Sequence, residues 1–258
     1  MTTDADPAVV ARLRAAGCVA ADEEAARMLA TTRDADTLEA WLRRRADGVP
    51  LAWITGWTTF CGARLHVAPG VYVPRQQTEE LARRAARVLP RSGFALDLCT
   101  GTGAVAAHLR RAVPDARVIG IDRDPGAARC ARDNGVTAVV GDLAAAMHGP
   151  QSVDVLTAVA PYVPTRALPL LPADARRHEP LAAFDGGPDG LDVVRRVVDD
   201  AARVLRPDGW LVFEVGGTQD DALEPELAAR GFAAATTWRD ADGDLRGMAA
   251  RRVTRISG

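Results

Sequence analysis

Lysine is absent from this 258-residue chain, and all 32 basic residues are arginines. Catalysis through a lysine Schiff base and phosphate binding through a Walker lysine are therefore excluded. Cysteine is scarce, and Cys18, Cys61, Cys99 and Cys130 form neither a Cys-x-x-Cys pair nor a cluster with histidine. This spacing predicts reduced thiols and no metal site.

Long apolar runs are also missing, since none approaches the roughly 20 residues that a membrane-spanning helix needs. Residues 1–8 are acidic and polar, whereas a signal peptide would be basic and then apolar. The formal net charge of -2 offers no general attraction to nucleic acid. We therefore expect a cytoplasmic protein without a membrane partner, and the sequence gives no indication of nucleic-acid binding.

The residues that are present, 48% hydrophobic and 26% charged, are ordinary for a globular protein. Up to residue 47, apolar residues three or four apart predict two or three short helices. Between residues 48 and 75, apolar and polar residues alternate among glycines, which predicts a β-hairpin that includes Trp53, Ile54 and Phe60. We expect a helical domain over 1–47, a hairpin linker over 48–75 and a main domain over 76–258.

The main domain contains a pattern typical of a nucleotide-type cofactor site. A short apolar strand at 94–98 leads into Cys99-Thr-Gly-Thr-Gly103 and then into a helix at 104–112. Gly101 and Gly103 allow a sharp turn and a close ligand, and the turn opens onto free amides at the helix N-terminus. A second strand, 117–121, ends at Asp122, about 20 residues on, where a carboxylate can accept from both hydroxyls of a ribose. These features predict a cofactor that contains adenosine.

Two cofactors fit this pattern. Gly101, Gly103 and Ala106 satisfy the dinucleotide fingerprint, so a nicotinamide-dependent dehydrogenase is an alternative. Asp97 argues against it, because a carboxylate just before the turn would repel a pyrophosphate but could accept from the ammonium of an amino acid. Asp142, after a third strand at 137–140, suits the exocyclic amine of adenine.

The region after a fourth strand, 153–158, is where a methyl acceptor would lie. Pro161 and Tyr162 follow this strand and begin a proline-rich insert over 161–190, which we interpret as part of an acceptor pocket. The remaining pattern predicts a helix at 191–205, a strand at 210–215 and a closing antiparallel pair at 232–238 and 248–253. Together these features resemble class I S-adenosylmethionine methyltransferases.

Five longer motifs narrow the resemblance. They are Gly48-Val-Pro-Leu-Ala-Trp-Ile-Thr-Gly56, Val73-Pro-Arg-Gln-Gln-Thr-Glu79, Ala160-Pro-Tyr-Val-Pro164, His178-Glu-Pro180 and Asp185-Gly-Gly-Pro-Asp-Gly-Leu191. In this order they resemble the HemK/PrmC protein-glutamine methyltransferases. The resemblance implies a Rossmann-like α/β fold with a seven-stranded, mostly parallel sheet and a small N-terminal helical domain. It also implies S-adenosylmethionine as cofactor and a glutamine side chain of a peptide-chain release factor as acceptor.

The pattern and the resemblance together assign two groups of site residues. The cofactor group is Arg75, Thr78, Asp97, Thr100, Gly101, Gly103, Asp122, Arg123, Asp142 and Leu143. The group at the reacting centre is Val159, Ala160, Pro161 and Tyr162. An Arg75–Glu79 ion pair is an equal alternative for Arg75. His178 and Glu179 are candidates for acid–base catalysis or for a structural role.

The chain departs from the family at the reacting centre, where Val159-Ala160-Pro161-Tyr162 replaces Asn-Pro-Pro-Tyr. The family's asparagine accepts a hydrogen bond from the weakly nucleophilic amide, and losing such a contact costs about 2 to 4 kcal/mol of barrier. We therefore expect a diverged acceptor: an amine, hydroxyl or carboxylate on a small molecule or a protein. The alternatives are glutamine methylation of release factors and a non-catalytic protein that binds S-adenosylmethionine.

Overall fold

The computed structural model describes residues 6–148 and 151–253, so the expected domain limits at residues 1 and 258 lie outside the described part. A seven-stranded sheet has the order β5-β4-β3-β6-β7-β9-β8, and β9 alone runs antiparallel to the other six strands. Its strands are β3 (Phe94–Leu98), β4 (Arg117–Asp122), β5 (Thr137–Val140), β6 (Val153–Ala158), β7 (Leu205–Phe213), β8 (Phe232–Arg239) and β9 (Leu245–Arg252). This confirms the predicted fold class and the closing antiparallel pair.

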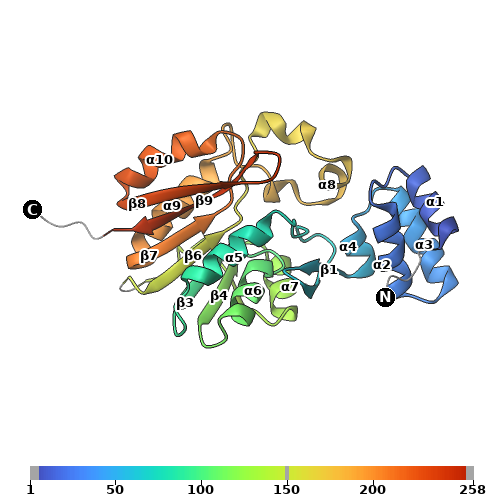
Figure 1. Cartoon of the computed structure of the whole chain (residues 1–258), viewed down its shortest axis with the longest axis horizontal. Helices are drawn as coiled ribbons and strands as arrows, with labels where there is room; N and C mark the ends of the chain where they lie inside the picture. The colour runs from blue at the N-terminus through green and yellow to red at the C-terminus, as the bar shows by residue number, and fades with distance from the viewer. Residues whose placement is uncertain (1–5, 149–150, 254–258) are drawn as a thin grey trace, which may run out of the picture.

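Helices cover both faces of the sheet (Figure 1). In β3, alternation sends Ala95 to one buried cluster and Leu96 and Leu98 to the other. The first cluster packs against α5 (Thr78–Val88) and α6 (Ala104–Ala112), beside α7 (Pro125–Asp133). The second packs against α9 (Asp192–Val204) and α10 (Gln219–Ala229). Because both faces are buried at the centre of the sheet, strands β3 and β6 are almost uniformly apolar.

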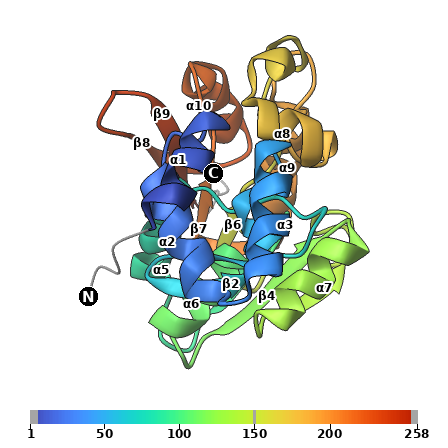
Figure 2. The same cartoon turned by 90° about the vertical axis from the view of Figure 1, so that its right-hand side faces the viewer.

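The N-terminal helices form a separate bundle at one end of the molecule (Figures 1 and 2). They are α1 (Pro7–Ala15), α2 (Ala21–Thr31) and α3 (Ala35–Ala46). Leu13, Ala25 and Met28 are almost fully buried in their shared core. The side chains of Asp6 and Asp34 cap the first turns of α1 and α3. These three helices match the prediction from apolar spacing.

The linker differs from the prediction, because its hairpin is short. Only β1 (Trp57–Phe60) and β2 (Ala63–His66) pair, whereas Trp53 and Ile54 lie on a short helix, α4 (Leu51–Thr55). Placing these two residues in the hairpin was therefore wrong. Gly56 ends α4 in the left-handed region at φ 80°, and the Trp53 indole donates to the Val71 carbonyl at 2.9 Å. An apolar run of five residues does not distinguish a strand from a buried helical turn.

The proline-rich insert after β6 contains three short helices. They are η1 (Thr165–Leu170), α8 (Ala173–His178) and η2 (Leu181–Ala183). Each begins directly after a proline, namely Pro164, Pro172 and Pro180. A fixed proline φ and a missing amide hydrogen are tolerated at this position.

Strand β7 begins at Leu205, five residues before the predicted start. Leu205 pairs with Val153, and a register shift lets the chain bulge before Trp210 pairs with Val155. Asp208 in the bulge has φ 67°. The residues between Leu205 and Trp210 thus form a bulge within the strand.

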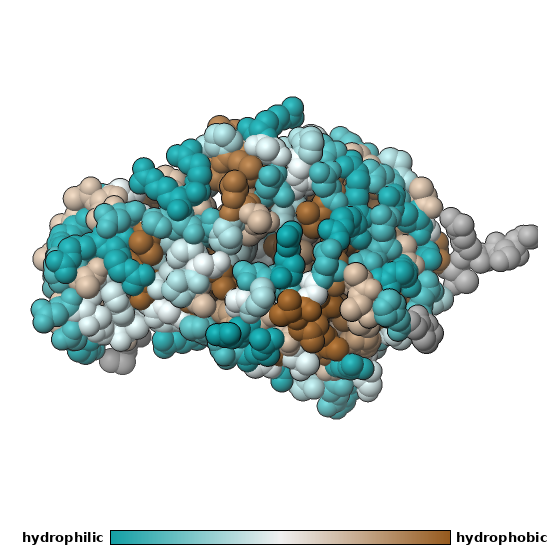
Figure 3. All heavy atoms as spheres, turned by 180° about the vertical axis from the view of Figure 1, so that it is seen from behind, coloured by the Kyte–Doolittle hydropathy of each residue, from teal (hydrophilic) through white to brown (hydrophobic). Residues whose placement is uncertain are grey.

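The surface seen from behind is mostly hydrophilic, with small apolar patches (Figure 3). None of the described helices is long and apolar enough to cross a membrane. Prominently exposed apolar side chains include Val139 and Val140 on the edge strand β5 and Leu170 on η1.

Asn134, just after α7, ties the hairpin to the glycine turn. Its amide donates to the carbonyls of His66 at 2.9 Å and Thr102 at 2.8 Å, and its oxygen accepts from the His66 amide at 2.7 Å. Three hydrogen bonds to main-chain groups thus depend on the only asparagine of the chain.

We predict that Asn134→Ala lowers the free energy of unfolding by about 1–3 kcal/mol, because main-chain groups lose their partners. Urea unfolding measures this change. Gln151→Ala is the matched control, since it removes a single exposed amide hydrogen bond, to the Ala202 carbonyl. Equal losses in the two variants would contradict the bridging role of Asn134.

Candidate active site

A cavity of about 980 Å³ opens where the chain leaves β3 and β6. These two strands are parallel neighbours, but the chain continues from β3 to β4 on the opposite side of β3. Such a switch point leaves a crevice at the carboxyl ends of the strands. Cys99, Asp122, Asp142 and Val159, which follow or end successive strands, all line the cavity. Its volume is at the upper end of the usual range for small-molecule sites, about 300–1,000 Å³.

The glycine turn is held rigidly beside this cavity. Gly101 and Gly103 have φ of 55° and 77°, and the Gly101 amide donates to Asp122 Oδ2 at 2.8 Å. A Cβ on Gly103 would lie 3.0 Å from Ala131 Cβ, so the turn also packs closely on α7. Of the predicted cofactor residues, Thr78, Asp97, Thr100, Gly101 and Gly103 are not among the lining residues.

Asp97 joins the turn to the centre of the sheet. Its side chain is 2% exposed and accepts from the hydroxyls of Thr100 at 2.5 Å and Thr157 at 2.7 Å. Burial raises the pKa of Asp97 to about 6, although the two hydroxyls favour the charged form. The predicted contact of Asp97 with the cofactor ammonium stays a prediction.

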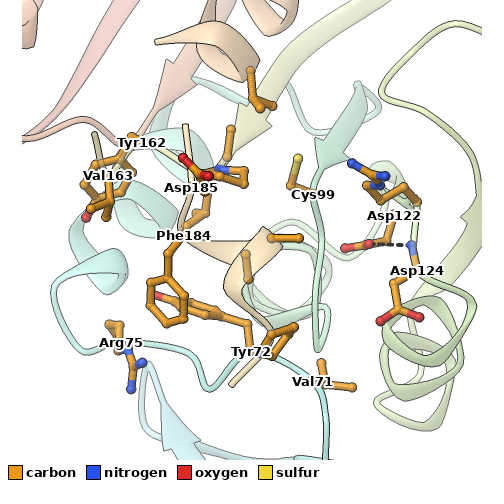
Figure 4. Close-up of a pocket in the computed structure, with 18 of the residues that line it drawn as sticks. Val71, Tyr72, Arg75, Cys99, Asp122, Asp124, Tyr162, Val163, Phe184 and Asp185 are labelled. Atoms are coloured by element: carbon orange, nitrogen blue, oxygen red, sulfur yellow. Dashed lines mark hydrogen bonds between the residues drawn. The ribbon is translucent and has the colours of Figure 1, made fainter. Parts of the chain in front are cut away.

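Asp122 and Asp142 lie at the cavity wall formed after β4 and β5. Asp122 accepts from the Gly101 amide at 2.8 Å. It also accepts from the Asp124 amide at 2.9 Å (Figure 4). Burial raises the pKa of Asp122. Asp142 is exposed and pairs with Arg196 at 2.7 Å. Arg123 and Leu143 line the same part of the cavity, so the structure brings four predicted cofactor residues together.

An aromatic wall faces this carboxylate side. Tyr72 meets Phe184 edge-on at 5.4 Å between ring centroids, and the Arg75 guanidinium lies 4.9 Å from the Tyr72 centroid (Figure 4). Burial raises the pKa of Tyr72 to about 12, so its hydroxyl is neutral at physiological pH. The wall combines linker and insert residues and was not predicted, since no local pattern relates residues 72 and 184.

Arg75 pairs with Glu179 of the insert at 2.5 Å, and Glu179 also accepts from the Val73 amide at 3.0 Å. The alternative Arg75–Glu79 pair is therefore wrong, and Glu79 instead pairs with Arg83. His178 Nε2 lies 3.2 Å from the Asp47 carbonyl. Neither His178 nor Glu179 lines the cavity, so their contacts support structural roles.

Val159, Ala160, Pro161 and Tyr162 all line the cavity after β6. The Tyr162 hydroxyl donates to Glu214 at 2.8 Å and accepts from the Gln77 amide at 3.0 Å. Burial, reinforced by the Glu214 charge, raises the pKa of Tyr162. The Thr78 hydroxyl donates to the same carboxylate at 2.7 Å, which explains why Thr78 lies behind the wall.

Gln77 and Glu214 were missed by the sequence analysis. A signal for Glu214 exists, because it is a lone carboxylate in the apolar run Trp210-Leu-Val-Phe-Glu-Val215. A charge within a buried strand requires partners at the site. Among the described residues, no group of three or more His, Cys, Asp and Glu is placed to hold a metal ion.

Comparisons with known proteins agree with this architecture. Residues 95–178 match a family model described as a methyltransferase domain. The release factor glutamine methyltransferase of Geobacter sulfurreducens is 37% identical over 206 residues, which cover 78% of this chain and 72% of that protein. Its namesake from Mycolicibacterium smegmatis is 35% identical over 263 residues, covering 97% and 92% of the two chains.

A solved structure shows the same fold. The ribosomal protein L11 methylase from Lactobacillus delbrueckii subsp. bulgaricus aligns with a TM-score of 0.54 and 18% identity, covering 73% of this chain and 84% of that one. The glycine turn, the carboxylates at the ends of β4 and β5 and the size of the cavity fit S-adenosylmethionine. The chain therefore belongs to the release factor glutamine methyltransferase family and is a class I S-adenosylmethionine-dependent methyltransferase.

Proposed function

We propose that this enzyme methylates an acceptor that is already nucleophilic: an amine, hydroxyl or carboxylate on a small molecule or a protein in the cytoplasm. One observation carries the proposal. The cavity wall directly after β6 presents Val159 and Ala160, whose side chains neither donate nor accept hydrogen bonds. An acceptor there is oriented by shape and proximity.

An amide nitrogen requires a positioned polar group, which the side chains of Val159 and Ala160 do not supply. Its lone pair is delocalised into the carbonyl, so transfer depends on a polar group that holds the NH2 in line with the methyl group. Two of the neighbouring polar side chains are already engaged: Tyr162 bonds with Gln77 and Glu214, and Arg75 pairs with Glu179. These contacts favour an acceptor that is nucleophilic without such a bond.

We further propose that the cofactor lies along the carboxyl ends of β3 to β5. Asp122 would accept from the ribose hydroxyls, and Asp142, Arg123 and Leu143 would surround the adenine. The lining positions of these four residues support this arrangement. When bound there, the cofactor supplies an electrophilic methyl group. Thr100, Gly101 and Gly103 shape the turn beside it, and Arg75 and Thr78 hold the opposite wall through Glu179 and Glu214.

Glutamine methylation of release factors is the second candidate. Relatives that match over 72% and 92% of their own length carry that name, which favours the inherited acceptor. In this case a main-chain carbonyl near Ala160 and the Tyr162 ring would hold the glutamine amide. The third candidate function is that of a non-catalytic protein that binds S-adenosylmethionine.

Substitution of Val159 tests these candidates. We predict that Val159→Asn increases methyl transfer to the glutamine of a recombinant release factor by about 10²–10³-fold, since it restores the missing hydrogen bond. Radiolabelled S-adenosylmethionine measures transfer to the release factor and to a panel of small amines, alcohols and carboxylates. Val139→Asn, at an exposed position of β5, is the matched control.

The wild-type enzyme is expected to methylate a member of this panel, or a protein amine, hydroxyl or carboxylate, faster than the release-factor glutamine. If wild type and Val159→Asn methylate the release-factor glutamine at the same measurable rate, this result would instead establish the second candidate. Cofactor binding without transfer to any acceptor would establish the third.

The pKa of Asp97 predicts how cofactor affinity depends on pH. We propose that its ionised form favours the positively charged cofactor, whereas burial raises its pKa to about 6 in the free protein. Protonation below this pKa opposes binding, so the Kd for S-adenosylmethionine should be about fourfold weaker at pH 5.5 than at pH 7.5. Titration calorimetry of wild type and Asp97→Asn checks this. A similar weakening in the variant would show that another group is responsible.

A further inference from the structure

Glu214 is a buried carboxylate that the proposed chemistry does not use. It lies directly after β7, is 1% exposed and does not line the cavity. Its backbone amide donates to the Ala158 carbonyl at 3.1 Å, beside Val159. Main chain and side chain of Glu214 thus both contact the segment that forms the acceptor wall.

The carboxylate connects three parts of the protein. Oε1 accepts from Gln77 Nε2 at 2.7 Å and from the Tyr162 hydroxyl at 2.8 Å, and Oε2 accepts from the Thr78 hydroxyl at 2.7 Å. Gln77 is the N-cap of α5 and Thr78 its first residue, Tyr162 belongs to the loop after β6, and Glu214 directly follows β7. All three side-chain partners are neutral donors. A buried charge is costly, and these hydrogen bonds together with the amino end of α5 offset that cost.

Two further contacts hold Tyr162 from the same segment. Gln219 Nε2 donates to the Tyr162 carbonyl at 2.9 Å. A Cβ on Gly216 would lie 3.3 Å from Tyr162 Cε2, so the glycine allows the ring to pack closely there. Residues 214–219 therefore hold Tyr162 through contacts with its hydroxyl, its ring and its main-chain carbonyl. In Figure 4, Tyr162 lies on the side of the cavity opposite Asp122.

We infer that Glu214 is a positioning residue of this methyltransferase: its carboxylate fixes the Tyr162 ring and the Gln77 amide, and thereby the shape of the acceptor side of the cavity. Glu214 touches neither acceptor nor cofactor. Tyr162 and Gln77 line the cavity, so a change at Glu214 reaches the acceptor through them. The inference rests on the proposed function, since it assigns Tyr162 to the acceptor side.

The chain has only two tyrosines, which allows a test without any acceptor. Protein labelled with 3-fluorotyrosine gives two fluorine NMR resonances, assigned with Tyr72→Phe and Tyr162→Phe. We expect Glu214→Gln to shift or broaden the Tyr162 resonance, because an amide cannot accept all three hydrogen bonds. Glu226→Gln is the control: it neutralises a partly buried carboxylate on α10 that pairs with Arg195 and Arg230, and should leave that resonance unchanged.

Function is measured on the same variants. We expect Glu214→Gln to lower the rate of methyl transfer, with recombinant release factor or a panel nucleophile as acceptor, on the order of 10- to 100-fold. The Kd for S-adenosylmethionine should stay unchanged by calorimetry. In a Tyr162→Phe background the additional loss should be smaller, because part of the effect passes through the tyrosine hydroxyl.

An unchanged Tyr162 resonance in Glu214→Gln would overturn the inference. The inference would also be overturned if the affinity for S-adenosylmethionine fell by the same factor as the rate of methyl transfer. Glu214 would then have a general structural role. The fluorine spectra need no acceptor, so failure of the proposed function and failure of this inference give different results.

Discussion

The parallel pairing of β3 with β6 is the constraint on which the site depends. It places Cys99 and Val159 at the same edge of the sheet, although 60 positions of sequence separate the paired residues Ala95 and Val155. The chain leaves the two strands in opposite directions, so no connection covers the space between them. Asp97 and Thr157, facing each other across this pair, fix the register with a buried hydrogen bond. The glycine turn and the cavity wall after β6 thus share one pair of strands as their support.

Much of the fold from β3 to β6 could be predicted because the sequence patterns that define it are local. A short apolar run, two glycines and a carboxylate at the next strand end are each recognised within a few residues. The four strands and the one helix predicted between residues 94 and 158 agree closely with β3, α6, β4, β5 and β6. The helix at Trp53 was missed for the opposite reason. Five apolar residues carry too little periodicity to separate helix from strand, and the tertiary contact of the indole with Val71 decides the outcome.

The opposite wall of the cavity could not be predicted, since its contacts join distant parts of the chain. Tyr72 reads as one more apolar position in the linker, and only the fold brings it against Phe184. The contacts of Glu214 could not be predicted either. A lone carboxylate in an apolar strand indicates that it has a partner but does not identify that partner. The predicted acid–base candidates His178 and Glu179 lie on an insert whose helices turn them toward residues 47, 73 and 75. The residue types therefore indicated the region of the site, whereas the contacts of each side chain depend on long-range packing.

The contacts that close the cavity have a consequence for how the protein is made. Arg75 and Glu179 are 104 positions apart, and Gln77 and Glu214 are 137 apart. The glycine turn and its first strands leave the ribosome before either partner is synthesised. Contacts of such separation form late, because the loop that they close must first be ordered. A nascent chain that ends before residue 214 therefore has the glycine turn but lacks the carboxylate that bonds with Gln77 and Tyr162.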